Sequence, residues 1–120
     1  MLSSVKHIIN ALLYSLQGLK RAWKSELAFR IEVSLLPIVI ILLCIIRPGP
    51  GWSAALIVGW LLVMALELLN SAIEEAFDLI SPDYNIHVKY GKDMASAAIL
   101  MGLLANGVLW LTMLWDRFIS

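Results

Sequence analysis

Five polar side chains recur at helical spacing near the end of a long apolar stretch. They are Glu67, Asn70, Ser71, Glu74 and Asp78. Intervals of three or four residues place these side chains on one face of a helix. A carboxylate inside the hydrocarbon layer of a membrane costs at least about 2.5 kcal/mol even on the mildest insertion scales. A one-sided row of such groups therefore indicates a place where something binds or reacts.

Carboxylates that lie close together repel one another unless a cation lies among them. Mg²⁺ suits such a site, because it takes oxygen ligands and is usually held by one or two carboxylates together with substrate phosphates. Lys92 adds a positive charge of the kind that binds phosphate. A carboxylate that does not bind the metal could accept a proton from a hydroxyl nucleophile. At a membrane surface these groups suggest phosphoryl transfer to a lipid hydroxyl. A structural polar seam, or a path for ions or protons, is the alternative.

The composition excludes several other classes of protein. Hydrophobic residues make up 61% of the 120 residues, more than a soluble domain of this length normally carries. The formal net charge is zero, so no basic field is available for nucleic acid. Cys44 is the only cysteine, which excludes an intrachain disulfide and a cysteine-based zinc site. Gly91 and Lys92 form only a dipeptide and not a phosphate-binding P-loop.

Three apolar segments are candidates to cross a membrane, and the fold class expected is all-α. We expect one domain over residues 1–120, divided as follows: an amphipathic surface helix over 3–27, and spans over 29–47, 52–80 with a cytoplasmic extension, and 92–116. Prolines and glycines in 47–51 and Pro82 break the chain between spans.

Positive charges set the expected orientation. Lysine and arginine are frequent before the first span and recur in 81–93, whereas only Arg47 lies in the first turn. Because positive residues favour the cytoplasmic side, the N-terminus and the second loop are expected there. The unusual polar groups at the ends of all three spans would then meet at the cytoplasmic interface.

Three blocks, in this order, closely resemble the prokaryotic diacylglycerol kinase family. They are Ala28-Phe29-Arg30-Ile31-Glu32, the run from Glu67 to Glu74, and the run from Lys92 to Ala98. The resemblance extends from Tyr14 to the third span. It implies a homotrimer of three-span subunits in the bacterial inner membrane, with active sites shared between neighbours. It also implies Mg-ATP as donor and diacylglycerol as acceptor, which gives phosphatidic acid.

The resemblance also implies roles for individual residues. Glu67 matches the general base, and Glu26 and Glu74 match the carboxylates that hold the metal. Positions matching the nucleotide site are His7, Tyr14, Glu26, Asn70, Glu74, Asp83, Tyr84, Asn85, Lys92 and Asp93. Positions matching the lipid site are Ala11, Ser15, Lys20, Arg21, Ala22, Trp23, Ala28, Phe29, Arg30, Ile31, Glu32, Glu67 and Ser96.

Three of these positions depart from the family pattern. Lys20 stands where a relative has arginine, which keeps the charge but loses the fork geometry. His7 stands where the family has an arginine, and Asn85 stands where it has a histidine. Outside the matched positions, Glu75 faces away from Glu67 on a helical wheel, and we interpret it as a solvated charge paired with a lysine. The tryptophans, Trp23 excepted, are interpreted as anchors at the membrane boundaries.

Two other functions stay open from the sequence. An undecaprenol kinase of the same family would use the same phosphoryl-transfer groups, so the motifs do not separate it from a diacylglycerol kinase. A non-enzymatic oligomer could conduct ions or protons along the carboxylate face, but it would have no use for Tyr14 or for Lys92 and Asp93.

Overall fold

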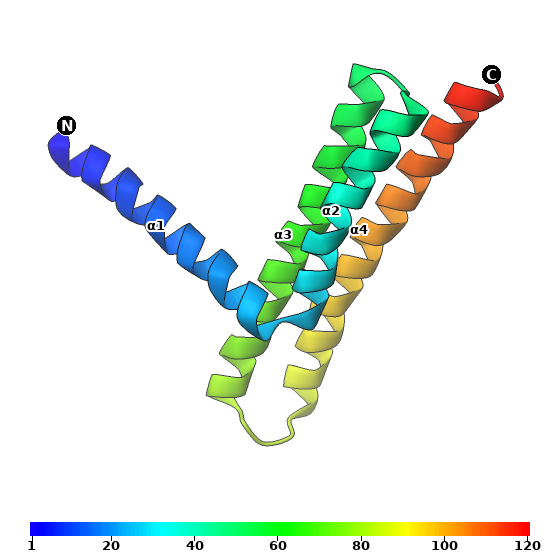
Figure 1. The fold of residues 1–120 in the computed structure, drawn as a ribbon. Helices are drawn as coiled ribbons and strands as arrows, with labels where there is room; N and C mark the ends of the chain where they lie inside the picture. Colours follow the sequence, from blue (N-terminus) through cyan, green and yellow to red (C-terminus); the bar gives the residue numbers. More distant parts are fainter.

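The computed structural model describes residues 1–120 as four helices and no strand. In chain order they are α1 (Leu2–Ser25), α2 (Leu27–Ile46), α3 (Pro50–Ile80) and α4 (Ile86–Phe118). Helices α2, α3 and α4 run side by side as a bundle, and α1 projects from this bundle at an angle (Figure 1). The all-α prediction is confirmed.

The three bundle helices have the length and apolar character of membrane spans. Each of α2, α3 and α4 is long and apolar enough to cross a bilayer, which confirms the predicted number of spans. Large apolar side chains lie exposed on their outer faces, among them Ile41, Leu104 and Leu111. A soluble monomer rarely exposes so much apolar surface, whereas lipid would cover these faces favourably.

Helix α1 has the character of a surface helix. Its only buried residue is Ala22, and apolar side chains such as Ile8 and Leu12 are exposed. Glu26 alone separates α1 from α2, and its extended backbone (φ −113°, ψ 105°) changes the direction of the chain. One residue outside the helical region is therefore enough to send α1 away from the bundle.

A tight turn joins α2 to α3. Arg47 ends α2 in the left-handed region (φ 55°), and Gly49 has φ 102°, a conformation that glycine adopts without steric cost. Pro50 then begins α3, where its missing N–H costs nothing. Helix α2 itself continues through Pro37.

Helices α3 and α4 form the most extensive contact of the bundle. Leu56 and Val63 of α3 and Met113 of α4 are fully buried. The Nδ2 of Asn106 donates hydrogen bonds to the carbonyl oxygens of Gly59 and Gly102, both at 3.0 Å. Gly102 belongs to α4 itself, so the bond to Gly59 is the one that ties α4 to α3.

The loop between α3 and α4 lies beyond the α1–α2 junction. Both helices continue past this junction before the loop joins them (Figure 1). The side chain of Asn85 accepts hydrogen bonds from the backbone N–H groups of His87 and Val88, so α4 begins at Ile86. The second half of the polar face of α3 and the first turns of α4 are therefore brought together outside the rest of the bundle.

Candidate active site

The polar side chains of α3 become more exposed along the helix, from Glu67 toward the α3–α4 loop. Glu67 and Asn70 are only 7% and 8% exposed and continue the buried face that includes Leu56 and Val63. Glu74 is half-buried and Asp78 is exposed. The row of polar groups therefore leads from the interior of the bundle out to the loop.

Three other carboxylates, those of Glu26, Glu32 and Glu74, interact electrostatically with Glu67. Glu26 from the α1–α2 junction and Glu74 from α3 lie close enough to repel its negative charge. Glu67 in turn repels Glu32 of α2, which is 8% exposed. The α1–α2 region and α3 thus both contribute acidic groups near the buried Glu67. None of these groups belongs to either ion pair of the chain.

Two buried oxygen atoms in this region have no hydrogen-bond partner. They are Oε2 of Glu32 and Oδ1 of Asn70. The Nδ2 of Asn70, by contrast, donates to Oε1 of Glu74 at 3.3 Å. Leaving a buried acceptor unpaired is costly, and native structures rarely do so without a reason. A proton donor or a cation bound in this region would satisfy both oxygens.

A groove lies in the angle between α1 and α3. Its volume is about 560 Å³. It is lined by Ser15, Gly18, Leu19, Arg21, Ala22, Ser25, Glu26, Leu68, Ser71, Ala72 and Glu75. Because it combines an arginine, two glutamates and small side chains beside an amphipathic helix, this groove suits a molecule with a polar head and an apolar body.

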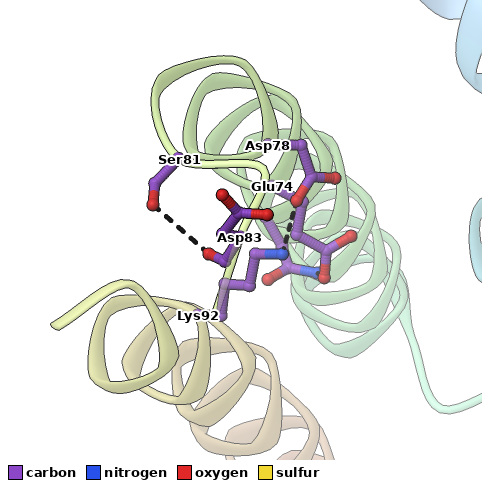
Figure 2. Close-up of polar contacts among 6 residues, drawn as sticks. Glu74, Asp78, Ser81, Asp83 and Lys92 are labelled. Carbon is purple, nitrogen blue, oxygen red and sulfur yellow. Dashed lines mark hydrogen bonds and ion pairs between the residues drawn. The ribbon is translucent and has the colours of Figure 1, made fainter. Parts of the chain in front are cut away.

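A second cavity, here called the loop cavity, surrounds the α3–α4 connection. Its volume is about 370 Å³. It is lined by Asp78, Ser81, Pro82, Asp83, Tyr84, Asn85, Val88, Lys89, Lys92 and Asp93. The hydroxyl of Ser81 donates to the carbonyl oxygen of Asp83 at 3.3 Å, which braces the loop at one side of the cavity (Figure 2).

Two ion pairs border the loop cavity. The Nζ of Lys92 lies 2.6 Å from Oδ1 of Asp78, which joins α4 to α3. The Nζ of Lys89 lies 2.7 Å from Oδ2 of Asp93 within α4. Figure 2 shows the ammonium group of Lys92 pointing toward the end of α3, where Glu74 and Asp78 project. Lys92 therefore lies between the loop cavity and the carboxylates of α3.

The structure divides the residues predicted for the nucleotide into three groups. Asp83, Tyr84, Asn85, Lys92 and Asp93 line the loop cavity. Glu26, Asn70 and Glu74 lie in the carboxylate region around Glu67. His7 and Tyr14 are exposed on α1 and line neither cavity.

The residues predicted for the lipid are also spread over several surfaces. Ser15, Arg21 and Ala22 line the α1–α3 groove, whereas Phe29 is 3% exposed and packs inside the protein. Ser96 is exposed on α4 and lines neither cavity. The remaining exposed or half-buried positions lie on α1 and the first turns of α2 without lining either cavity: Ala11, Lys20, Trp23, Ala28, Arg30 and Ile31.

Sequence reasoning missed several residues of the two cavities. Glu75 lines the α1–α3 groove and joins no ion pair, so its predicted pairing with a lysine is wrong. Ser71 lines the groove with it, and Lys89 and Asp78 line the loop cavity without having been assigned there. The spacing of Asp78 from Glu74 was the one available signal, because both belong to the same helical face.

The acidic groups alone do not make a closed metal site. No three His, Cys, Asp or Glu side chains lie close enough together to hold a metal ion. The carboxylates of Glu26 and Glu74 and the unpaired Oδ1 of Asn70 are nevertheless oxygen donors in one region. Because Mg²⁺ is usually held by one or two carboxylates, waters and substrate phosphates, this donor set fits a magnesium ion that arrives with a nucleotide.

Comparisons with known proteins agree with this chemistry. The family described as prokaryotic diacylglycerol kinase matches residues 13–114. A diacylglycerol kinase of Escherichia coli K12 is 37% identical over 111 residues, which cover 92% of this chain and 91% of the relative. One of Haemophilus influenzae is 41% identical over 108 residues, covering 90% and 92%. One of Pseudomonas aeruginosa is 38% identical over 112 residues, covering 93% and 91%.

The match includes α2 and α3 entirely, the second half of α1 and most of α4. It therefore contains both cavities and the carboxylates around Glu67. The chain therefore belongs to the prokaryotic diacylglycerol kinase family and is a membrane enzyme of the lipid kinase class.

Proposed function

We propose that this protein transfers the γ-phosphoryl group of Mg-ATP to the free hydroxyl of diacylglycerol and releases phosphatidic acid and ADP. The observation that carries the proposal is the buried Glu67, which lies beside the carboxylates of Glu26 and Glu74. The loop cavity with Lys92 lies farther along the same side of α3. A base and a phosphate-binding region are thus adjacent, as phosphoryl transfer requires.

Glu67 is the general base of this proposal. It belongs to neither ion pair, so its carboxylate is available to accept a proton. The proton of the lipid hydroxyl passes to Glu67 as the hydroxyl oxygen forms its bond to the γ-phosphorus. The bond between that phosphorus and the β,γ-bridging oxygen breaks, and the electron pair leaves with ADP.

Glu26 and Glu74 would hold the magnesium ion, and Asn70 would direct its unpaired Oδ1 toward the same region. When bound, the ion neutralises negative charge that develops on the phosphate oxygens. Through this ion, Glu26 and Glu74 would hold the phosphates of ATP beside the α1–α2 junction.

The loop cavity would hold the nucleotide. Lys92 contacts phosphate and Asp93 contacts the sugar, while Asp83, Tyr84 and Asn85 form the loop side of the site. The Oδ1 of Asn85 already accepts two backbone hydrogen bonds, so its amide nitrogen is the atom that remains for a ligand.

The lipid would enter through the α1–α3 groove at the cytoplasmic surface of the bacterial inner membrane. Arg21 and Ser15 line this groove, and the amphipathic α1 would lie in the interface beside it. Positive residues before α2 and near the α3–α4 loop support a cytoplasmic N-terminus.

A homotrimer would complete the site. His7 and Tyr14 are exposed on the projecting α1, away from the loop cavity of their own chain. A neighbouring subunit could receive them, with Tyr14 beside the adenine. This arrangement explains why the matched nucleotide residues do not all meet within one subunit.

The test is phosphate transfer from labelled Mg-ATP by the purified protein in mixed micelles, with diacylglycerol and undecaprenol offered separately. Glu67→Gln is the inactive variant, and Asp116→Asn at the opposite end of the bundle is the matched control. Labelled phosphatidic acid from the wild type and Asp116→Asn, but not from Glu67→Gln, supports the proposal. Label on undecaprenol alone would change the substrate, and no label on either would contradict the proposed reaction.

A further inference from the structure

Asp78 makes the ion pair that joins α3 to α4. Its Oδ1 lies 2.6 Å from Nζ of Lys92, and the two residues are 14 positions apart in the chain. The other lysine of the loop cavity, Lys89, pairs with Asp93 on its own helix. The two lysines therefore have separate partners, and Asp78 is the partner that draws Lys92 toward α3.

This pair has little value as a clamp for the fold. The Asp78 side chain is 67% exposed and that of Lys92 35%, and ion pairs that water reaches contribute little to stability. The contact between α3 and α4 is already fixed deeper in the bundle, where Asn106 donates to the carbonyl of Gly59. Stabilisation of the fold therefore does not explain why Asp78 pairs with Lys92.

The flexibility of the lysine side chain explains the pair. The lysine side chain has four methylene groups, so an ammonium group without a partner can occupy many positions. Ordering this group when phosphate binds costs conformational entropy. An ammonium has three N–H donors, so Lys92 can keep one bond to Asp78 and direct the others to phosphate oxygens. Asp78 holds the ammonium on the side of the loop cavity that faces Glu74 (Figure 2).

We infer that Asp78 is a positioning residue for nucleotide binding: it holds the ammonium group of Lys92 between the loop cavity and Glu74, ready for the phosphates of ATP. Asp78 acts through Lys92 and does not itself contact the phosphates. The inference rests on the proposed function, because it takes ATP as the occupant of the loop cavity. The sequence places Asp78 on the polar face of α3 but assigns it no individual role, and the inference supplies one.

A double-mutant cycle tests this inference, with Asp78→Asn, Lys92→Met, the double variant and Asp116→Asn as the matched control. Two quantities are measured for each protein in detergent: kcat/KM for Mg-ATP, and the Kd of a non-hydrolysable ATP analogue with Mg²⁺. The KM for diacylglycerol and the thermal unfolding midpoint are measured as well. Asp78→Glu, which keeps the charge, is the conservative variant.

Asp78→Asn is expected to lower kcat/KM for Mg-ATP and to weaken analogue binding by about tenfold, the scale of one charge-assisted hydrogen bond. The KM for diacylglycerol and the unfolding midpoint stay close to those of the wild type, and Asp78→Glu recovers part of the loss. In the Lys92→Met background, Asp78→Asn has less than about a twofold further effect, because its target is gone.

Three results would overturn the inference. One is analogue binding by Asp78→Asn that is as tight as in the wild type, or tighter, because Asp78 would then be neutral or a competitor of phosphate. Another is a loss of analogue binding on adding Asp78→Asn to Lys92→Met that is as large as the loss in the wild-type background. The third is an equal loss in the Asp116→Asn control. If the wild type transfers no phosphate to any lipid and binds no analogue, the proposed function itself fails, and this inference fails with it.

Discussion

The indole Nε1 of Trp60 on α3 donates a hydrogen bond of 2.8 Å to the backbone carbonyl oxygen of Glu32 on α2. This bond reaches the α2 residue whose carboxylate lies near Glu67 and carries an unpaired buried oxygen. Trp60 thus fixes the distance between the two helices at the height of the acidic region. Its role is a specific contact between spans, and not the boundary anchor that the sequence suggested.

Trp60→Phe should therefore disturb the site as well as the fold. The variant removes one part-buried hydrogen bond, so the free energy of unfolding should fall by about 1 kcal/mol. Activity should fall by more than the loss of folded protein explains, because the α2 backbone is no longer tied to α3 at Glu32. Unfolding and kcat are measured on the same detergent samples. Trp110 also packs against the core, and a Trp110→Phe variant that lost as much activity would contradict the argument.

Glu67→Gln should remove most activity and leave the fold intact. The amide keeps the shape of the side chain but cannot accept the hydroxyl proton, and losing a general base typically costs 10²- to 10⁴-fold in rate, so kcat should fall by at least about a hundredfold. Because the substitution also removes repulsion with Glu26 and Glu74, the thermal midpoint should stay unchanged or rise. Near-normal turnover by a folded Glu67→Gln protein would show that another group is the base.

Glu26→Gln and Glu74→Gln should each raise the Mg²⁺ concentration needed for half-maximal activity. Each variant removes one of the charged oxygen donors that would hold the ion. The measurement is a Mg²⁺ titration of activity at fixed ATP, with Asp116→Asn as the control. Titration curves of both variants that superimpose on the wild-type curve would exclude the two residues as ligands.

The sequence predicts the helices far better than it predicts how they face one another. Apolar length is enough to find the three spans, and helical spacing places Glu67, Asn70 and Glu74 on one face. The approach of Glu32 to Glu67 depends on how α2 rotates against α3, which no local pattern encodes. The same holds for Lys92 and Asp78, whose contact depends on the loop between their helices.

The α1 residues show a second limit. Periodicity predicts an amphipathic helix, and the structure has one. The direction in which α1 leaves the bundle, however, depends on the backbone of one residue, Glu26. Tyr14 is exposed on α1, so its predicted contact with a nucleotide depends on that direction and, in the proposed trimer, on a second subunit.

Glycine positions offer a test of how closely α3 and α4 pack. A Cβ atom at Gly59 would lie 2.9 Å from Oδ1 of Asn106 and 3.3 Å from Cδ1 of Leu109, whereas a Cβ at Gly107 would meet nothing within 4 Å. Gly59→Ala should therefore force the two helices apart and lower the free energy of unfolding by about 1 to 3 kcal/mol. Gly107→Ala is the matched control and should be neutral or slightly stabilising, because alanine favours the helix.

The two alanine variants are compared by thermal unfolding in detergent and by phosphate transfer. Separation of α3 from α4 at Gly59 would also weaken the bond from Asn106 that fixes their contact, and so move Lys92 relative to Glu74. Gly59→Ala should therefore lose activity at temperatures where it is still folded, and Gly107→Ala should not. Equal stability and equal activity of the two variants would show that the close approach at Gly59 does not determine the position of Lys92 relative to Glu74.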